Sequence, residues 1–157
     1  MRRSGPAASV ALAILFLAAG GLKSHELPRE PQRLFAMTEL KSGQGGHYFV
    51  TASVNGRDIK AVVDTGASAV ALSYADAERI GLKPRLLTYD VPVSTANGLG
   101  MAARVTLREV EIDTVRVDNV QGLVLQDGAI DVTLLGMSFL GKLRGFSVEN
   151  GRLILKN

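Results

Sequence analysis

The chain has 157 residues, of which 46% are hydrophobic and none is cysteine, and its formal net charge is +3. This length supplies one modest hydrophobic core, so a large multidomain enzyme is excluded. The absence of cysteine excludes disulfides, thiolate metal ligands and thiol nucleophiles, and two histidines, His25 and His47, are too few for a histidine-rich metal centre. We therefore expect no metal and no cofactor, and any chemistry must use carboxylates, hydroxyls or backbone groups.

The excess of basic over acidic residues lies entirely in residues 1–33. Residues 34–157 carry 13 basic and 13 acidic side chains, so this part of the chain is neutral. Aromatic residues make up 5% of the chain, and no stripe of Lys and Arg with interleaved aromatics is present. This pattern does not supply the phosphate contacts of a nucleic-acid-binding protein, and we expect no nucleic-acid partner.

Residues 1–22 have the pattern of a signal peptide or an N-terminal membrane anchor. Arg2 and Arg3 precede residues 7–22, which are apolar except for Ser9 and a Gly-Gly pair. The apolar centre is shorter than the ~20 residues of a spanning helix, and the segment is either cleaved as a signal peptide or retained as a membrane tether through residues 7–22. Both alternatives predict that the rest of the chain is exported, and a buried core helix is a third, less favoured interpretation.

Residues 23–33 combine charged residues with two prolines and show no apolar period, which predicts an extended linker. The predicted folded domain is therefore residues 34–157.

The folded domain consists mainly of short strands separated by turn signals. Apolar runs flank Asn-Gly pairs at 55–56, 97–98 and 150–151, and each pair predicts a β-hairpin. One short helix is expected at residues 74–80, between Ser73 as N-cap and Gly81, and another at residues 137–141. Many strands at this spacing predict an all-β fold, a small closed β-barrel with one or two short helices.

One passage combines an apolar strand with residues that can carry chemistry. Residues 62–63 run directly into Asp64-Thr65-Gly66-Ala67-Ser68, which places a carboxylate at a strand end. The ordinary interpretation is turn chemistry, because Asp-Thr-Gly forms turns readily. About 70 residues later, Leu134-Leu135 again runs into a glycine, Gly136, which opens the second short helix.

These two motifs and the hairpin between them resemble the retropepsin-like aspartic proteases (clan AA), in particular their small single-lobe bacterial members that are exported or membrane-anchored. The motifs have the order and spacing of that family, and the resemblance covers residues 48–155. It implies a closed barrel of the retropepsin type and the activity of an aspartic endopeptidase. It also implies a periplasmic location, either anchored to the inner membrane or released by signal cleavage.

The resemblance implies roles for individual residues. Asp64 is the catalytic residue, and Thr65 holds the two catalytic loops together across the subunit axis. Gly66 lets the substrate backbone approach, and Ser68 donates a hydrogen bond towards Asp64. The later pair, Leu135-Gly136, packs beneath the catalytic loop.

The substrate-binding residues implied by the resemblance come from two places. Gly66 and Ala67 belong to the catalytic loop, and Asn97, Gly98 and Leu99 belong to a hairpin that resembles the flap closing over a peptide substrate.

Aspartic proteolysis needs two carboxylates that share one proton, and this chain has one Asp-Thr-Gly. Asp113-Thr114 and Asp131 are not followed by the required glycine. The resemblance therefore implies a homodimer with a peptide or protein substrate, in which two copies of Asp64 activate a water molecule. We expect a cleavage optimum on the acidic side of neutral.

Two residues depart from the retroviral pattern. Ser68 stands where an acidic residue is common, and Met137 stands where an Arg is common. Because that Arg supports the subunit contact, we expect another segment, residues 153–155, to take its place. Met101, Met137 and Phe139 are expected in the core, and the carboxylates between Glu109 and Asp118 on a solvated face.

Two other functions remain open from the sequence. The same fold could be a non-catalytic peptide-binding or regulatory dimerisation module. A purely structural β domain would be monomeric and would tolerate replacement of Asp64.

Overall fold

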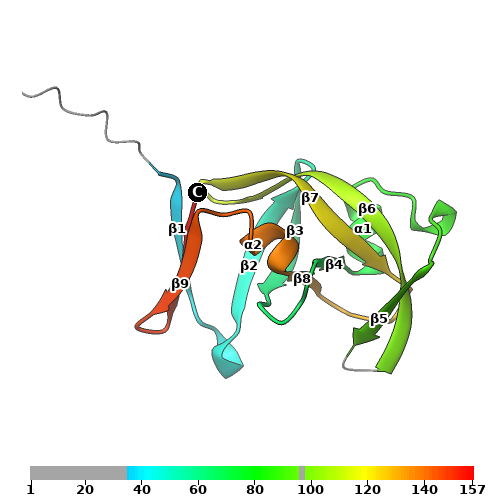
Figure 1. Ribbon diagram of the computed structural model, residues 1–157, viewed down its shortest axis with the longest axis horizontal. Helices are drawn as coiled ribbons and strands as arrows, with labels where there is room; N and C mark the ends of the chain where they lie inside the picture. The colour runs from blue at the N-terminus through cyan, green and yellow to red at the C-terminus, as the bar shows by residue number, and fades with distance from the viewer. Residues whose placement is uncertain (1–34, 96–97) are drawn as a thin grey trace, which may run out of the picture. The chain divides into compact units, whose positions relative to one another are not determined.

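The computed structural model describes residues 35–95 and 98–157 (Figure 1). These residues belong to one compact unit, 34–157. The predicted signal peptide or anchor, the predicted linker and Asn97 lie outside the described residues. Within the described ranges, no helix has the length and apolar character needed to cross a membrane.

The described elements are ten strands, two α-helices and two 3₁₀ turns. In chain order they are β1 (Met37–Lys41), η1 (Gln44–Gly46), β2 (Tyr48–Val54), β3 (Arg57–Val63), β4 (Val70–Leu72), α1 (Tyr74–Arg79), η2 (Pro84–Leu86), β5 (Val91–Thr95), β6 (Gly98–Ile112), β7 (Val115–Leu125), β8 (Thr133–Leu135), α2 (Met137–Leu140), β9 (Gly145–Glu149) and β10 (Arg152–Lys156).

Six strands close into a barrel. The hydrogen-bonded order is β2-β3-β8-β4-β7-β6, and a further pairing of β6 with β2, Val54 opposite Val110, completes the ring. Strand β5 extends this sheet beyond β6. The short strands β4 and β8 have parallel neighbours in β7 and β3, and the other pairings are antiparallel. The predicted all-β closed barrel with two short helices is therefore confirmed.

The hairpins form where the sequence supplies residues that tolerate a positive φ. Asn55 and Gly56 have φ of 53° and 80°, and Asn150 and Gly151 have φ of 51° and 73°. Positive φ at both central residues gives the two-residue turn whose twist matches the flanking strands. The β5–β6 ladder continues to the pair Thr95–Gly98, which frames the third predicted hairpin.

The barrel interior is filled by the alternate apolar residues of its strands. Ala52, Val54 and Ile59 are at most 1% exposed, and Leu107 on β6 is fully buried. Phe139 of α2 is also fully buried, as expected. Met101 is half-buried, whereas the prediction for Met137 is wrong, since this side chain is 37% exposed. A helix of four residues presents one side to the core, and Met137 lies on the other.

Helix α1 begins and ends close to the prediction. The Oγ of Ser73 accepts a hydrogen bond from the backbone N–H of Asp76 (3.2 Å), which caps the first turn. Ile80 caps the C-terminal end, and Gly81 follows with a φ of 88°. Helices commonly end at a residue in the left-handed conformation, and glycine adopts that conformation without a steric penalty.

A second sheet lies beside the barrel (Figure 1). Its order is β1-β10-β9, with both pairings antiparallel. Leu153 and Leu155 of β10 are at most 2% exposed and face the core of their own chain. Both edges of β10 are occupied within the chain, and the expected role of residues 153–155 at a subunit contact stays a prediction.

Candidate active site

Asp64 follows the last residue of β3 and is held by backbone hydrogen bonds on both sides. Its N–H donates to the carbonyl of Leu135 (3.1 Å), and its carbonyl accepts from Ala67 N (3.3 Å). Its Oδ1 accepts a hydrogen bond from the N–H of Gly66 (2.8 Å). The strand end and the turn after it therefore determine where the carboxylate lies.

Residues 64–69, here called the Asp64 loop, rest on Gly136. The parallel pairing of β3 with β8 sets Val63 opposite Leu135, so the two strands end side by side. A Cβ on Gly136 would lie 2.3 Å from the Ala69 carbonyl oxygen and 2.5 Å from that of Ala67. The N–H of Met137, which follows Gly136, donates to Ala67 O at 2.8 Å. The structure thus brings Leu135 and Gly136 directly against the Asp64 loop.

A serine that the sequence analysis did not single out supports the same region. The Oγ of Ser138 accepts from Val70 N (2.9 Å) and donates to Gln121 O (2.6 Å). One hydroxyl in the first turn of α2 thereby joins β4 to β7, just after the Asp64 loop ends. The sequence feature that could have indicated this role is the position of Ser138, two residues after Gly136.

A buried carboxylate supports β8 from the other side. Asp76 of α1 is 7% exposed, and its Oδ2 accepts from the Thr133 hydroxyl at 2.8 Å. The Thr133 hydroxyl also accepts from Ser73 N (3.3 Å). Helix α1 is therefore linked to the strand that leads to Gly136. The sequence analysis placed this aspartate in the helix but did not predict its contact with Thr133, 57 residues away.

The Asp64 loop presents its functional groups to solvent. Thr65, Gly66 and Ser68 are exposed, and Asp64 and Ala67 are half-buried. Within the described residues, no hydrogen bond joins Ser68 to Asp64, and Asp64 Oδ2 has no hydrogen-bond partner. The carboxylate is thus oriented by backbone groups while one oxygen remains open.

The predicted flap residues lie on a separate hairpin. Gly98 and Leu99 pair with Thr95 and Ser94 at the turn end of β5 and β6, and Leu99 is 89% exposed. No described hydrogen bond connects them to the Asp64 loop. The third predicted flap residue, Asn97, lies outside the described residues.

Glu109 of β6 and Asp118 of β7 form a charge network with Arg116, and Glu109 is less solvated than expected, because its side chain is 16% exposed. Glu109 Oε2 lies 2.6 Å from the guanidinium of Arg116, which also pairs with Asp118 at 3.0 Å. The hydrogen bond that Arg116 Nε donates to Asp118 Oδ1, together with the charges of Asp118 and Glu109, raises the pKa of Arg116. These carboxylates are neutralised by cations and do not form an acid–base pair.

Tyr89 precedes β5 and has a buried hydroxyl. In the described part of the chain, its Oη has no hydrogen-bond partner. Burial, with a smaller contribution from Tyr74, raises the pKa of Tyr89 above its ordinary value of 10.0.

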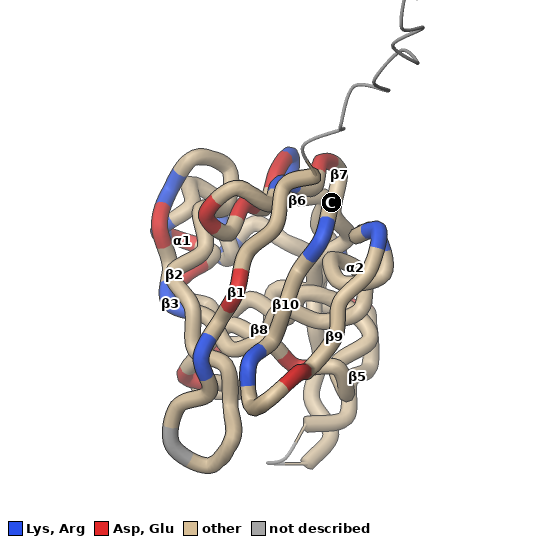
Figure 2. The backbone as a smooth tube through the Cα atoms, turned by 90° about the vertical axis from the view of Figure 1, so that its left-hand side faces the viewer, with Lys and Arg blue, Asp and Glu red and all other residues tan. Residues whose placement is uncertain are grey.

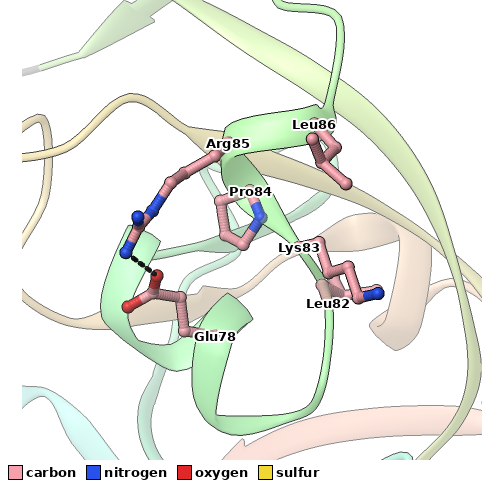
Figure 3. Close-up of a pocket in the computed structure, with 6 residues that line it drawn as sticks. All are labelled: Glu78, Leu82, Lys83, Pro84, Arg85 and Leu86. Atoms are coloured by element: carbon pink, nitrogen blue, oxygen red, sulfur yellow. Dashed lines mark ion pairs between the residues drawn. The ribbon is translucent and has the colours of Figure 1, made fainter.

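A surface hollow of about 330 Å³ lies between α1 and η2 (Figure 3). Its walls include Leu82, Pro84 and Leu86, and its polar contact is an exposed ion pair between Arg85 and Glu78 (3.9 Å). None of its lining residues belongs to the Asp64 loop. Among the described residues, no group of three or more His, Cys, Asp or Glu side chains is arranged to hold a metal ion.

Comparison with known proteins identifies the family. Residues 50–142 match the model of the family described as "gag-polyprotein putative aspartyl protease". The chain belongs to this aspartyl protease family. The matched region of the aspartyl protease domain includes the Asp64 loop, Gly136 and the six barrel strands in whole or in part.

Two curated relatives of this aspartyl protease family member are uncharacterized proteins. One, from Sinorhizobium sp, is 46% identical over 118 residues, covering 75% of this chain and 51% of the relative. The other, from Rickettsia prowazekii, is 42% identical over 115 residues, covering 73% of this chain and 48% of the relative. The chain therefore spans about half the length of the curated relatives it matches.

Solved structures support the retropepsin-like fold. A retropepsin-like aspartic protease from Rickettsia conorii matches with a TM-score of 0.70 and 37% identity, covering 78% of this chain and 91% of that one. The EIAV protease, complexed with the inhibitor HBY-793, matches with a TM-score of 0.56 and 18% identity, covering 70% of this chain and 100% of that one. The second likeness concerns the fold alone.

Proposed function

We propose that this chain is an aspartic endopeptidase that works as a homodimer and cleaves peptide bonds with a water molecule held between two Asp64 carboxylates. The observation that carries the proposal is the placement of Asp64. Backbone groups of Gly66 and Leu135 orient it, and among the described residues its second carboxylate oxygen has no hydrogen-bond partner.

The number of such loops supports the homodimer. One described loop per chain combines a strand end, Asp-Thr-Gly and a supporting glycine. Asp113 lies in the β6–β7 turn with a φ of 50°, and Asp131 is not followed by a glycine. A second carboxylate of the same kind must come from a second copy, which a two-fold axis supplies.

The chemistry follows from two carboxylates in close proximity. Like charges this close cannot both be ionised, so the pair holds one proton. The ionised Asp64 takes a proton from the water, and the protonated one polarises the scissile carbonyl. Thr65 joins the two loops across the axis, Gly66 and Ala67 contact the substrate backbone, and residues 97–99 close over it.

We also propose that the domain acts outside the cytoplasm. The apolar segment at residues 7–22 and its flanking arginines support export, either by a cleaved signal peptide or with a retained tether. A tether would raise the local concentration and favour dimer formation.

The test compares the full-length wild type with Asp64→Asn and, as a matched control, Asp113→Asn. Asp113 is exposed and precedes a threonine, and asparagine tolerates its positive φ. Each protein is incubated with a peptide library at about pH 4 to 8, and products are identified by mass spectrometry. We expect cleavage by wild type and Asp113→Asn, fastest at acidic pH, and none by Asp64→Asn.

Three results would contradict this proposal. Cleavage by Asp64→Asn at the wild-type rate would remove Asp64 from the mechanism. A rate that is flat across this pH range would exclude a shared proton. A wild-type dimer that binds peptides without cutting them would establish the binding module instead.

A further inference from the structure

His47 lies directly before β2, and the strand register sets it beside Asp64. Tyr48 pairs with Val63 at the end of the antiparallel β2–β3 ladder, so the next residues along the two strands are His47 and Asp64. His47 has an extended backbone, with φ −81° and ψ 148°, and therefore continues the direction of β2. Opposed residues of antiparallel strands have Cα atoms about 4.5–5.5 Å apart. A histidine is thus the cross-strand neighbour of the proposed catalytic carboxylate.

The two side chains share the outer face of the sheet. Tyr48 packs against the core and Val63 is buried, and side chains alternate along a strand, so His47 and Asp64 are directed outward. Phe49, two residues after His47, is 59% exposed on this outer face. Its ring meets the His47 imidazole edge-on, with ring centroids 6.4 Å apart. This contact agrees with the alternation, because residues two apart on a strand lie on one face.

The loop before β2 limits where the imidazole can lie. The carbonyl of His47 accepts a hydrogen bond from Gly43 N (2.8 Å). A Cβ on Gly45 would lie 3.2 Å from His47 Cδ2, so the ring rests against the backbone of η1. Gly45 has a φ of 70°, a conformation that favours glycine. The ring is exposed to solvent but is held between η1 and Phe49, and within the described residues neither of its nitrogens has a hydrogen-bond partner.

We propose that His47 is a positioning residue that acts through Asp64, because its positively charged imidazole favours the ionised form of the carboxylate pair. This inference rests on the proposed function, in which the pair holds one proton. An imidazole is ordinarily charged below about pH 6.5, so a cation is present in the acidic range where cleavage is expected. The described ion pairs do not include His47 with Asp64, so the two charges act on each other over a longer, partly solvated distance.

Few other charges lie on the elements around His47. The residues of η1 carry none. Figure 2 shows β1 and β10 side by side, and their register pairs Lys41 with Arg152 at the ends nearest this loop. Lys60 lies on the outer face of β3, four residues before Asp64 and about 13 Å from it. A charge at that distance is largely screened at physiological ionic strength, where the Debye length is about 8 Å. All of these cations are retained when His47 is replaced.

Replacement of His47 by a neutral residue should move the acid limb of the pH–rate profile. Without the imidazole charge, the carboxylate pair takes up its second proton, and loses activity, at higher pH. Opposite charges about 7 Å apart in a largely aqueous medium shift a protonation equilibrium by about 0.3–1 pH unit. We expect the acid limb of kcat/KM for full-length His47→Gln to rise by this amount. His47→Arg keeps the positive charge and should stay close to wild type. Lys60→Gln, which removes a cation from the same face, is the matched control and should leave the limb in place.

The same coupling can be measured without cleavage, because it is reciprocal. A carboxylate at Asp64 must favour the charged form of His47 to the same extent. Proton NMR of the imidazole Cε1–H follows the titration of His47, and the His47→Gln spectrum separates its signal from that of His25. We expect the titration midpoint to fall by about 0.3–1 pH unit in Asp64→Asn. Asp58→Asn, six residues earlier on the same face of β3, should leave the midpoint unchanged.

The two measurements separate this inference from the proposed function. A raised acid limb in His47→Gln and a lowered NMR midpoint in Asp64→Asn support the inference. A uniform loss of rate at every pH, with the acid limb in place, would assign His47 a merely structural role and overturn it. An unchanged NMR midpoint in Asp64→Asn would overturn it as well. A lowered midpoint in a protein whose wild type cleaves no peptide would support the coupling of His47 with Asp64 and contradict the endopeptidase.

Discussion

The contact between Gly136 and the Asp64 loop leaves no room for a side chain, so Gly136→Ala tests whether this glycine supports the loop. Gly136 has φ −92° and ψ −167°, an extended conformation that alanine adopts without strain. Any effect must therefore come from the added methyl group, which would lie 2.3 Å and 2.5 Å from the carbonyl oxygens of Ala69 and Ala67.

The size of the effect follows from these distances. A carbon and a carbonyl oxygen come no closer than about 3.3 Å, so the loop must move by about 1 Å. That movement would stretch the 2.8 Å bond from Met137 N to Ala67 O beyond hydrogen-bonding distance. Overpacking and the lost bond together should cost about 2–4 kcal/mol of unfolding free energy. Because Asp64 belongs to the displaced loop, kcat/KM of the folded protein should fall about 100-fold.

Urea unfolding followed by far-ultraviolet circular dichroism measures the stability, and peptide cleavage measures the activity. Gly100→Ala is the matched control, because its added methyl group would lie at an ordinary 3.8 Å from Val93 Cγ2. A Gly136→Ala protein within about 0.5 kcal/mol of wild type, with unchanged cleavage, would refute the supporting role of this contact.

Three further substitutions test other parts of the site by urea unfolding. Ser138→Ala removes both hydrogen bonds of the hydroxyl and should lower the free energy of unfolding by about 1–3 kcal/mol. An unchanged urea midpoint would contradict the role of Ser138 in joining β4 to β7. Asp76→Ala removes the acceptor of the buried Thr133 hydroxyl and should lower the free energy of unfolding by about 2–3 kcal/mol, whereas the exposed Glu78→Ala should lower it little. Tyr89→Phe removes a buried, unpartnered hydroxyl and should stabilise by about 1 kcal/mol. Because the pKa of Tyr89 is raised in the folded state, wild type should lose further stability above about pH 10 relative to Tyr89→Phe, and a constant difference would contradict this.

Local rules in the sequence predict much of this fold. The Asn-Gly pairs predict two-residue turns because asparagine and glycine tolerate positive φ, and Asn55 and Asn150 adopt it. Ser73 predicts the start of α1 because its hydroxyl can cap the first turn. These features depend on neighbouring residues, so a single sequence contains the information.

Features that depend on distant segments were not predictable in the same way. The pairing of β3 with β8 joins residues about 70 apart, and nothing local in Thr133 indicates its bond to Asp76. The packing of Gly136 under the Asp64 loop was expected from a family resemblance rather than from the residues themselves. The apolar runs around the Asn-Gly pair at 150–151 correctly predict that β10 is a strand, but they do not reveal that both edges of β10 are occupied.

Mixing subunits tests the central claim, that one active site requires Asp64 from two chains. Wild type and Asp64→Asn are combined in varying proportions at a fixed total concentration that favours dimers, allowed to exchange, and assayed for peptide cleavage. If both carboxylates are needed, activity falls as the square of the wild-type fraction, to about a quarter in an equal mixture. A linear fall, to about a half, would show that each chain acts alone and would contradict the shared pair.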